Sequence, residues 1–502
     1  MSYEGKIERK IVMDKMNCLI EIGSIEKKFS DLINSKLAGF NDENRVITTQ
    51  VINDAVDLIE DLVRDVYAFD MAFDNYNNGM SFMPQYYFEN IVLHDDMIWE
   101  RIIIIIAIAY QIDFEVIFDK RGIGYLYKII KKDERINGDI KKIIQDINSD
   151  YDMKKLKFLR NGNEHYISTH LSDSPEKDKF KVDIKALIYI KDEIVYGDVQ
   201  KINIQTDNMN REEMEILKNK VSIIQNKKSK YIELLSLCIE QMGIVFKNGD
   251  FYLNQKKHFL PEYSTPLCVE KDICSKCEIL EVKYGELREE LRSVIDMINK
   301  NVLVALSDAS RIRNTLLIDS LFRAKEIIRS INLYYSCIFY KEEIVENGKK
   351  EAFKKYCMNE IIYPNYYYFH AMLKLYSVFE KVAKFLLCKY DFKKEYLDDG
   401  KFRNMYIDKI VELFSENKIT SDILREFYNC ISSEEYKMYE KLRNREYHCL
   451  RTVYVLDEED GCIFINDCIC KMEKLIRSLY KLFFMIINEE KVIYEKIVAD
   501  NR

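Results

Sequence analysis

The chain has few of the residues that make tight turns: its 502 residues include 5 prolines and 15 glycines. A protein built from many β-hairpins needs more of both, because turns use the fixed φ of proline and the positive φ that glycine accepts. Isoleucine, leucine, lysine, glutamate, tyrosine and phenylalanine are plentiful instead. The composition therefore predicts a mainly helical protein.

Long apolar runs and a surplus of positive charge are also missing. The longest apolar stretch, Ile102–Tyr110, is too short to span a bilayer and is typical of a buried core helix. The first residues lack the layout of a signal peptide. The formal net charge of −8 argues against a surface that binds nucleic acid over its whole extent. The 13 scattered cysteines suit a reducing compartment, so we expect a cytoplasmic protein without a membrane partner.

Two short segments in opposite halves of the chain share one pattern. Residues 158–166 (FLRNGNEHY) and 441–449 (KLRNREYHC) both read Leu-Arg-Asn, then three residues, then His. The chain holds only 6 histidines, so two matches of this kind are hard to attribute to chance.

Further matches lie at a nearly constant offset of about 280 residues, which is the signature of an internal repeat. The segment 84–90 (PQYYFEN) resembles 364–370 (PNYYYFH), with a proline placed where helices tolerate it, in the first turn. An aromatic-Glu-basic triplet follows in each copy, at 99–101 and at 379–381. Upstream of these matches, residues 52–65 resemble residues 317–330, although more weakly. We therefore predict a duplication.

The duplication divides the chain into four parts. We expect an N-terminal helical extension over 1–45 and two helical bundles, over 46–250 and 306–502, that pack about a pseudo-two-fold axis. The segment 251–305 holds two of the prolines and a charged helix, and it is the expected linker.

The pattern changes after each motif. Alternating apolar and polar residues at Lys179–Ile188 and Thr452–Asp467 predict small β-hairpin insertions. Long amphipathic helices are expected to close the two bundles, at Arg211–Ile244 and Lys471–Val498.

Each motif brings together side chains that suit phosphodiester chemistry. The Asn and the His are four positions apart, which places the amide and the imidazole on one helix face. The guanidinium suits a phosphate, and the imidazole exchanges protons near neutral pH. One imidazole cannot easily act as both base and acid, but two copies brought face to face could. The pattern thus favours a composite site that cleaves RNA without a metal.

At these residues the chain resembles the HEPN superfamily, whose hallmark is Arg, four to six residues, then His, commonly with Asn after the Arg. The resemblance implies helical bundles that dimerise to form a metal-independent endoribonuclease site with no cofactor. Such domains occur in toxins, abortive-infection systems and CRISPR effectors, so the implied partners are an RNA substrate, an antitoxin or regulatory protein, and a second copy of the chain. The implied site residues are Arg160, Asn161, His165, Arg443, Asn444 and His448.

Several neighbouring residues admit two interpretations. Glu100 and Glu380 either support the site from an adjacent helix or are helix-surface charges and partners of a core arginine. A set of basic residues either contacts RNA or forms a solvated helix face: Lys154, Lys155, Lys157, Lys441, Arg445 and Arg451. Four linker residues either bind a structural zinc ion or are free thiols with a histidine nearby: His258, Cys268, Cys274 and Cys277.

Two alternative functions stay open. The paired domains could bind RNA, a nucleotide or a partner without cutting it, with the polar motif only holding the interface. A compact RNA-guided CRISPR-type RNase is also conceivable, although such effectors are usually larger and basic, as holding a guide requires.

Overall fold

The structure is a computed structural model of the 502-residue chain. It describes residues 3–37, 43–74, 83–113, 122–149, 204–247, 364–390, 405–448, 451 and 458–500, and fourteen residues between 313 and 334. These residues are mainly α-helical, and no strand occurs among them, so the predicted fold class is confirmed.

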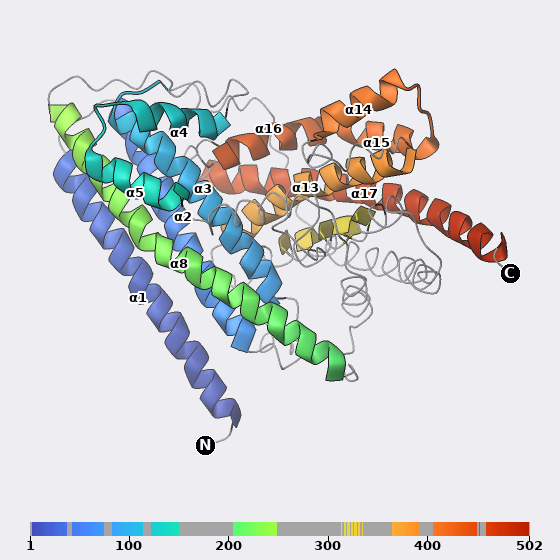
Figure 1. Ribbon diagram of the computed structural model, residues 1–502, viewed down its shortest axis with the longest axis horizontal. Coiled ribbons are helices and arrows are strands. Elements are labelled where there is room, and N and C mark those ends of the chain that lie inside the picture. The colour runs from blue at the N-terminus through green and yellow to red at the C-terminus, as the bar shows by residue number, and fades with distance from the viewer. Residues whose placement is uncertain are drawn as a thin grey trace.

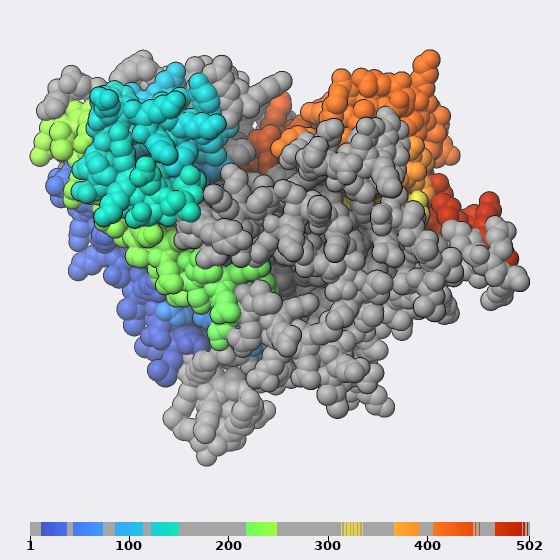
Figure 2. Space-filling model, viewed as in Figure 1, coloured from blue at the N-terminus to red at the C-terminus, as the bar shows by residue number. Residues whose placement is uncertain are grey.

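The first group of helices comes from the N-terminal half. Its long members are α1 (Tyr3–Leu37), α2 (Glu43–Asp74), α3 (Met83–Ala109) and α8 (Ile204–Lys247). These four pack side by side, with α3 between α2 and α8 (Figure 1). The short helix α4 (Gly122–Lys132) packs on α3, the short helix α5 (Gly138–Ser149) packs on α8, and both lie at the surface in Figure 2. The predicted extension thus packs as α1 against the first bundle.

The second group comes from the C-terminal half. It contains α13 (Pro364–Tyr390), α14 (Ile407–Glu416), α15 (Asp422–Ser432), α16 (Glu434–His448) and α17 (Glu458–Asp500). Helical residues between 313 and 334 run beside α13, and the end of α16 reaches α3 (Figure 1). The two groups therefore meet along a seam formed by α2, α3, α13 and the end of α16.

Helices α3 and α13 are buried on every side. Ile102 to Ile106 are all at most 1% exposed, and Val378, Phe379 and Ala383 of α13 are equally inaccessible. A helix that is apolar around its circumference belongs in a core, as the run Ile102–Tyr110 predicted. Pro84 is the second residue of α3 and Pro364 the first of α13, where the missing N–H has no helical partner to lose.

Contacts at matching positions of the predicted repeats resemble one another. In the first, Arg101 Nε lies 2.6 Å from Asp54 Oδ2, and in the second, Lys381 Nζ lies 2.7 Å from Asp319 Oδ2. Arg101 and Lys381 are the basic residues of the two triplets, and the aspartates occupy the same place in 52–65 and 317–330.

The two groups also make reciprocal contacts across the seam. Tyr86 of α3 shares a 3.0 Å hydrogen bond with Ser330, while Tyr366 of α13 donates to Asp65 of α2. The tyrosines match in the sequence alignment of the repeats, and so do Ser330 and Asp65. A pseudo-two-fold interface would produce an exchange of this kind, and the duplication itself stays a prediction.

One predicted hairpin is wrong. The backbone from Glu458 to Asp467, which includes the proposed Asp-Gly turn and the second strand of the hairpin, belongs to helix α17. Acidic residues at Glu458, Glu459 and Asp460 favour the N-terminus of a helix, and this outweighs the cost of roughly 1 kcal/mol for Gly461 inside it. The other hairpin, at 179–188, lies outside the described residues.

The closing helices are confirmed as α8 and α17, each longer than predicted. Among the described residues, no helix is apolar enough over the length that a bilayer crossing requires. The linker over 251–305 lies outside the described residues, so its boundaries stay predictions.

Candidate functional site

The second motif lies on the last two turns of α16. This helix begins after Ser433, whose Oγ accepts a 3.1 Å hydrogen bond from the backbone N–H of Tyr436, and two glutamates occupy its first turn. Both features favour a helix start at this point. The motif is therefore carried by a regular, capped helix. The first motif, with Arg160, Asn161 and His165, lies outside the described residues.

Arg443 is buried, with 6% of its surface exposed. Its Nη1 donates to Asn444 Oδ1 across 3.0 Å, so adjacent motif residues are held together. The guanidinium carbon lies 5.0 Å from the centre of the Tyr376 ring and 5.2 Å from that of Tyr447, within the range of cation–π attraction. The side chain is thus fixed by rings and an amide.

Arg443 differs from the other buried arginines that the structure describes. Arg64, Arg101, Arg323 and Arg451 each form ion pairs with one or more carboxylates. Arg443 has no carboxylate within ion-pair distance among the described residues, and its Nε has no hydrogen-bond acceptor there. A buried guanidinium without a counter-anion is costly unless an anion arrives to bind it.

Acidic and phenolic groups surround this guanidinium. Glu380 lies one turn beyond Tyr376 on α13 and is 1% exposed. Burial raises the pKa of Tyr376 well above its usual value, with Glu380 adding to the effect and Arg443 opposing it. Burial also raises the pKa of Glu440, which lies one turn before Arg443 on α16. The phenol therefore stays protonated at neutral pH and can donate a hydrogen bond.

The end of α16 is bound to the first group of helices. Tyr447 donates from its hydroxyl to Asp96 Oδ2 across 2.6 Å, and its carbonyl accepts from Arg101 Nη1 across 3.0 Å. Beyond the helix, Arg451 Nη1 lies 3.0 Å from Asp61 Oδ2. His448 is the last residue of α16, directly between these anchors, although its side chain lies outside the described part. The second motif is therefore placed at the seam between the repeats.

The proposed supporting residues are both buried on the central helices. Glu100 on α3 is 6% exposed and Glu380 on α13 is 1% exposed, so neither is a helix-surface charge. They occupy matching positions in the two repeats, and Glu380 reaches the surroundings of Arg443.

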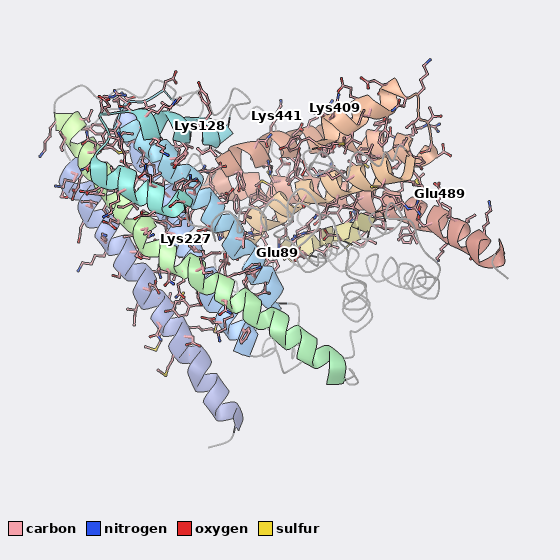
Figure 3. All side chains as sticks on the ribbon, in the orientation of Figure 1. Glu89, Lys128, Lys227, Lys409, Lys441 and Glu489 are labelled. Carbon is pink, nitrogen blue, oxygen red and sulfur yellow. The ribbon has the colours of Figure 1, made fainter. Side chains whose placement is uncertain are left out.

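The proposed RNA contacts fall into three classes. Lys441 is exposed and projects from the outer side of α16 (Figure 3). Arg451 is 8% exposed and lies between Asp54 and Asp61, so its charge is already compensated and we do not retain it as an RNA contact. The side chains of the others lie outside the described residues: Lys154, Lys155, Lys157 and Arg445. The same holds for the linker set His258, Cys268, Cys274 and Cys277.

The sequence interpretation overlooked a buried polar cluster near the start of α13. It consists of Asp65, Asn90, His94, Tyr366 and His370, all between 0% and 5% exposed. Asp65 Oδ2 lies 2.7 Å from His94 Nδ1, and Asn90 Nδ2 donates to the Tyr366 hydroxyl across 2.8 Å. The available signal was the placement of two of the 6 histidines on the aligned central helices. Those histidines are on different elements, so only the fold brings them together.

The seam places the fixed guanidinium of Arg443 beside the phenol of Tyr376, which can donate a proton to a hydrogen bond. His448 of the same motif follows about one turn later on α16. A guanidinium binds an oxyanion by two parallel N–H donors when one approaches in its plane. Comparisons of the chain with protein-family models, with curated proteins and with solved structures found no match.

Proposed function

We propose that the protein is a metal-independent endoribonuclease with a composite active site at the seam between its two repeats. The observation that carries the proposal is Arg443, a buried guanidinium that lacks a carboxylate partner among the described residues and lies on the helix that crosses the seam. The resemblance to the HEPN superfamily supplies the reaction, and the placement of α16 supports it.

In this proposal the histidine of one motif acts as the general base and the histidine of the other motif as the general acid. One imidazole, of His165 or His448, removes the proton from the ribose 2′-hydroxyl, and the 2′-oxygen attacks the neighbouring phosphorus. The guanidiniums of Arg160 and Arg443 stabilise the additional negative charge on the phosphorane. The other imidazole protonates the 5′-oxygen as its bond to phosphorus breaks. The products are a 2′,3′-cyclic phosphate and a 5′-hydroxyl.

Asn161 and Asn444 position the other motif residues. Asn444 Oδ1 accepts from Arg443 Nη1, which holds the guanidinium in one orientation. A preorganised cation stabilises the transition state without reorganising during the reaction. Glu380 and Tyr376 complete the surroundings of Arg443 as positioning residues.

The test is cleavage of total RNA by the purified full-length protein in excess EDTA. The expected result is RNA fragments with 2′,3′-cyclic phosphate ends, lost in His165→Ala and in His448→Ala. Lys409→Ala is the matched control, because Lys409 is exposed and pairs with Glu412, an exposed residue on the same helix. Undiminished cleavage in both histidine variants would rule out the composite site.

A non-catalytic function is the second candidate, because a buried guanidinium on ordered helices also suits a binding site for a nucleotide or RNA. The two candidates differ in the fate of the substrate. The binding protein leaves RNA intact and still retains it on a filter, while the enzyme binds a 2′-deoxy analogue without cutting it.

As a toxin or defence effector, the enzyme is expected to arrest growth when it is expressed alone. The arrest should be absent with His448→Ala and relieved by an antitoxin or regulatory protein. Whether a second copy of the chain is needed can be read from the dependence of cleavage on protein concentration.

A further inference from the structure

Three ionisable side chains meet where α2, α3 and α13 come together. Asp65, His94 and His370 are each completely buried, and one ligand atom of each lies within 4.8 Å of the others. The two imidazole rings lie 4.9 Å apart, centre to centre, at an angle of 73°. Two of the residues come from the first group of helices and one from the second.

The hydrogen bonds of this cluster are incomplete. His94 Nδ1 is hydrogen-bonded to Asp65 Oδ2, but His94 Nε2 has no hydrogen-bond partner among the described residues. His370 has no partner there for either Nδ1 or Nε2. Buried polar atoms almost always have a hydrogen-bond partner. Three imidazole nitrogens without such a partner in one cluster therefore indicate a site for a bound ligand.

The carboxylate is oriented by its neighbours. Tyr366 donates its hydroxyl to Asp65 Oδ1 and is itself held by Asn90 Nδ2 at 2.8 Å. This leaves Asp65 Oδ2 facing the two histidines. Outer hydrogen bonds that fix a ligating carboxylate are typical of metal sites in proteins.

We propose that Asp65, His94 and His370 bind a divalent transition-metal ion, with Zn²⁺ as the ion that fits best. Imidazole nitrogens and a carboxylate oxygen are zinc ligands, whereas Mg²⁺ and Ca²⁺ take mostly oxygen. Bonds of about 2.0–2.2 Å place tetrahedral ligands roughly 3.3 Å apart. Since the three atoms already lie within 4.8 Å, shifts of about 1 Å complete the arrangement.

The charges around the cluster are compatible with a cation. Lys374 faces it from α13, but its Nζ lies 3.6 Å from Glu326 Oε2 and 3.8 Å from the centre of the Tyr86 ring. Arg451 is bound by Asp54 and Asp61. Both cations therefore have counter-charges of their own.

The metal would join the two repeats and take no part in the cleavage. Tyr376, beside Arg443, lies six residues beyond His370 on α13, about 9 Å along the helix axis. The site is also distinct from the linker set of one histidine and three cysteines. Loss of the ion is expected to weaken the seam, which gives a measurement that does not depend on the proposed nuclease activity.

The first experiment measures zinc in the full-length protein purified from zinc-supplemented cultures. The background protein carries the substitutions Cys268→Ser, Cys274→Ser and Cys277→Ser, so that the linker cysteines cannot bind zinc. One equivalent of zinc is expected in this background, and a loss of at least tenfold on adding His370→Gln. The matched control is Tyr86→Phe, a buried change at the same seam that should retain the ion.

The second experiment keeps the proposal testable if His370→Gln fails to fold. Co²⁺ replaces Zn²⁺ in the same background, which lacks the three linker cysteines, and the expected result is ligand-field absorption without thiolate-to-metal charge transfer. Adding Zn²⁺ to metal-depleted protein is expected to raise Tm by several degrees. No bound metal and no rise in Tm would overturn the proposal, as would zinc that is lost with the cysteines and retained in His370→Gln.

Discussion

Lys381 and Asp319 form a completely buried ion pair, with 2.7 Å between Nζ and Oδ2. The matching pair, Arg101 and Asp54, is equally inaccessible, but Asp54 also accepts from Arg451. Asp54 is therefore shared by two guanidiniums, those of Arg101 and Arg451. Replacing each aspartate tests what its ion pair contributes.

Replacing either aspartate should destabilise the protein, because each substitution deprives a buried cation of a carboxylate. Breaking a buried ion pair by removing one partner costs about 3–5 kcal/mol. Urea unfolding followed by circular dichroism measures both changes. Glu412→Gln, an exposed pair member, is the control and should stay within about 0.5 kcal/mol. No loss of stability in an aspartate variant would show that its ion pair contributes little.

Arg443 and Arg451 are expected to separate function from stability. Within the described part of the chain, Arg443→Gln leaves no carboxylate without a partner, so stability should change by about 1 kcal/mol or less, while RNA cleavage falls by roughly 100-fold or more. Arg451→Gln leaves Asp54 and Asp61 with less compensation and should destabilise the fold by about 3 kcal/mol. Cleavage rates and urea midpoints of both variants provide the measurement. A normal rate for folded Arg443→Gln would exclude it from the active site.

Two tyrosines at matching positions should respond differently to loss of the hydroxyl. Tyr366→Phe deprives both Asp65 and Asn90 of a partner and is expected to cost about 2 kcal/mol. Tyr86→Phe removes hydrogen bonds to the neutral side chains of Ser330 and Asn90 and no bond to a carboxylate, and it should cost about 1 kcal/mol. Thermal unfolding of the two variants at one pH ranks them. The reverse order would show that the polar cluster on the Asp65 side contributes little.

Asp57 makes stability depend on pH. Burial raises its pKa to about 7, although Arg451 opposes the shift. Between about pH 4 and pH 7 the folded chain therefore holds a proton that the unfolded chain has lost, so stability falls as pH rises and levels off above pH 7. Asp57→Asn should match the wild type at pH 4 and exceed it at pH 8 by roughly 2 kcal/mol, allowing for partial exposure. Urea midpoints at both pH values measure it, and a variant with no advantage at pH 8 would contradict the assigned pKa.

The helices could be predicted from local patterns, because proline placement and apolar periodicity are properties of neighbouring residues. Pro84 and Pro364 mark the starts of the two central helices, and the run Ile102–Tyr110 marks a core. The alternation of apolar and polar residues at Thr452–Asp467 led to the wrong prediction of a hairpin. It is too short to outweigh the acidic residues at the helix start and the helical pattern that continues through α17.

The candidate site could be predicted only in part. The position of Arg443 on a helix followed from the motif, but its lack of a carboxylate depends on which side chains the fold brings near. Arg451 looked like one more basic residue beside the motif, and its partner Asp54 lies 397 residues away in the chain. His94 and His370 meet for the same reason, through tertiary contacts between elements that no local pattern relates.

The ion pair between Arg451 and Asp54 also has a consequence for synthesis. At 5–20 residues per second, a ribosome needs roughly 20 to 80 seconds to translate the 397 residues that separate them. During that interval the nascent N-terminal half holds Asp54 and Asp61 without one of their cations. The ion pair that ties the end of α16 to α2 can therefore form only after Arg451 has been synthesised, so this part of the seam closes after α2, α3, α13 and α16 have all been translated.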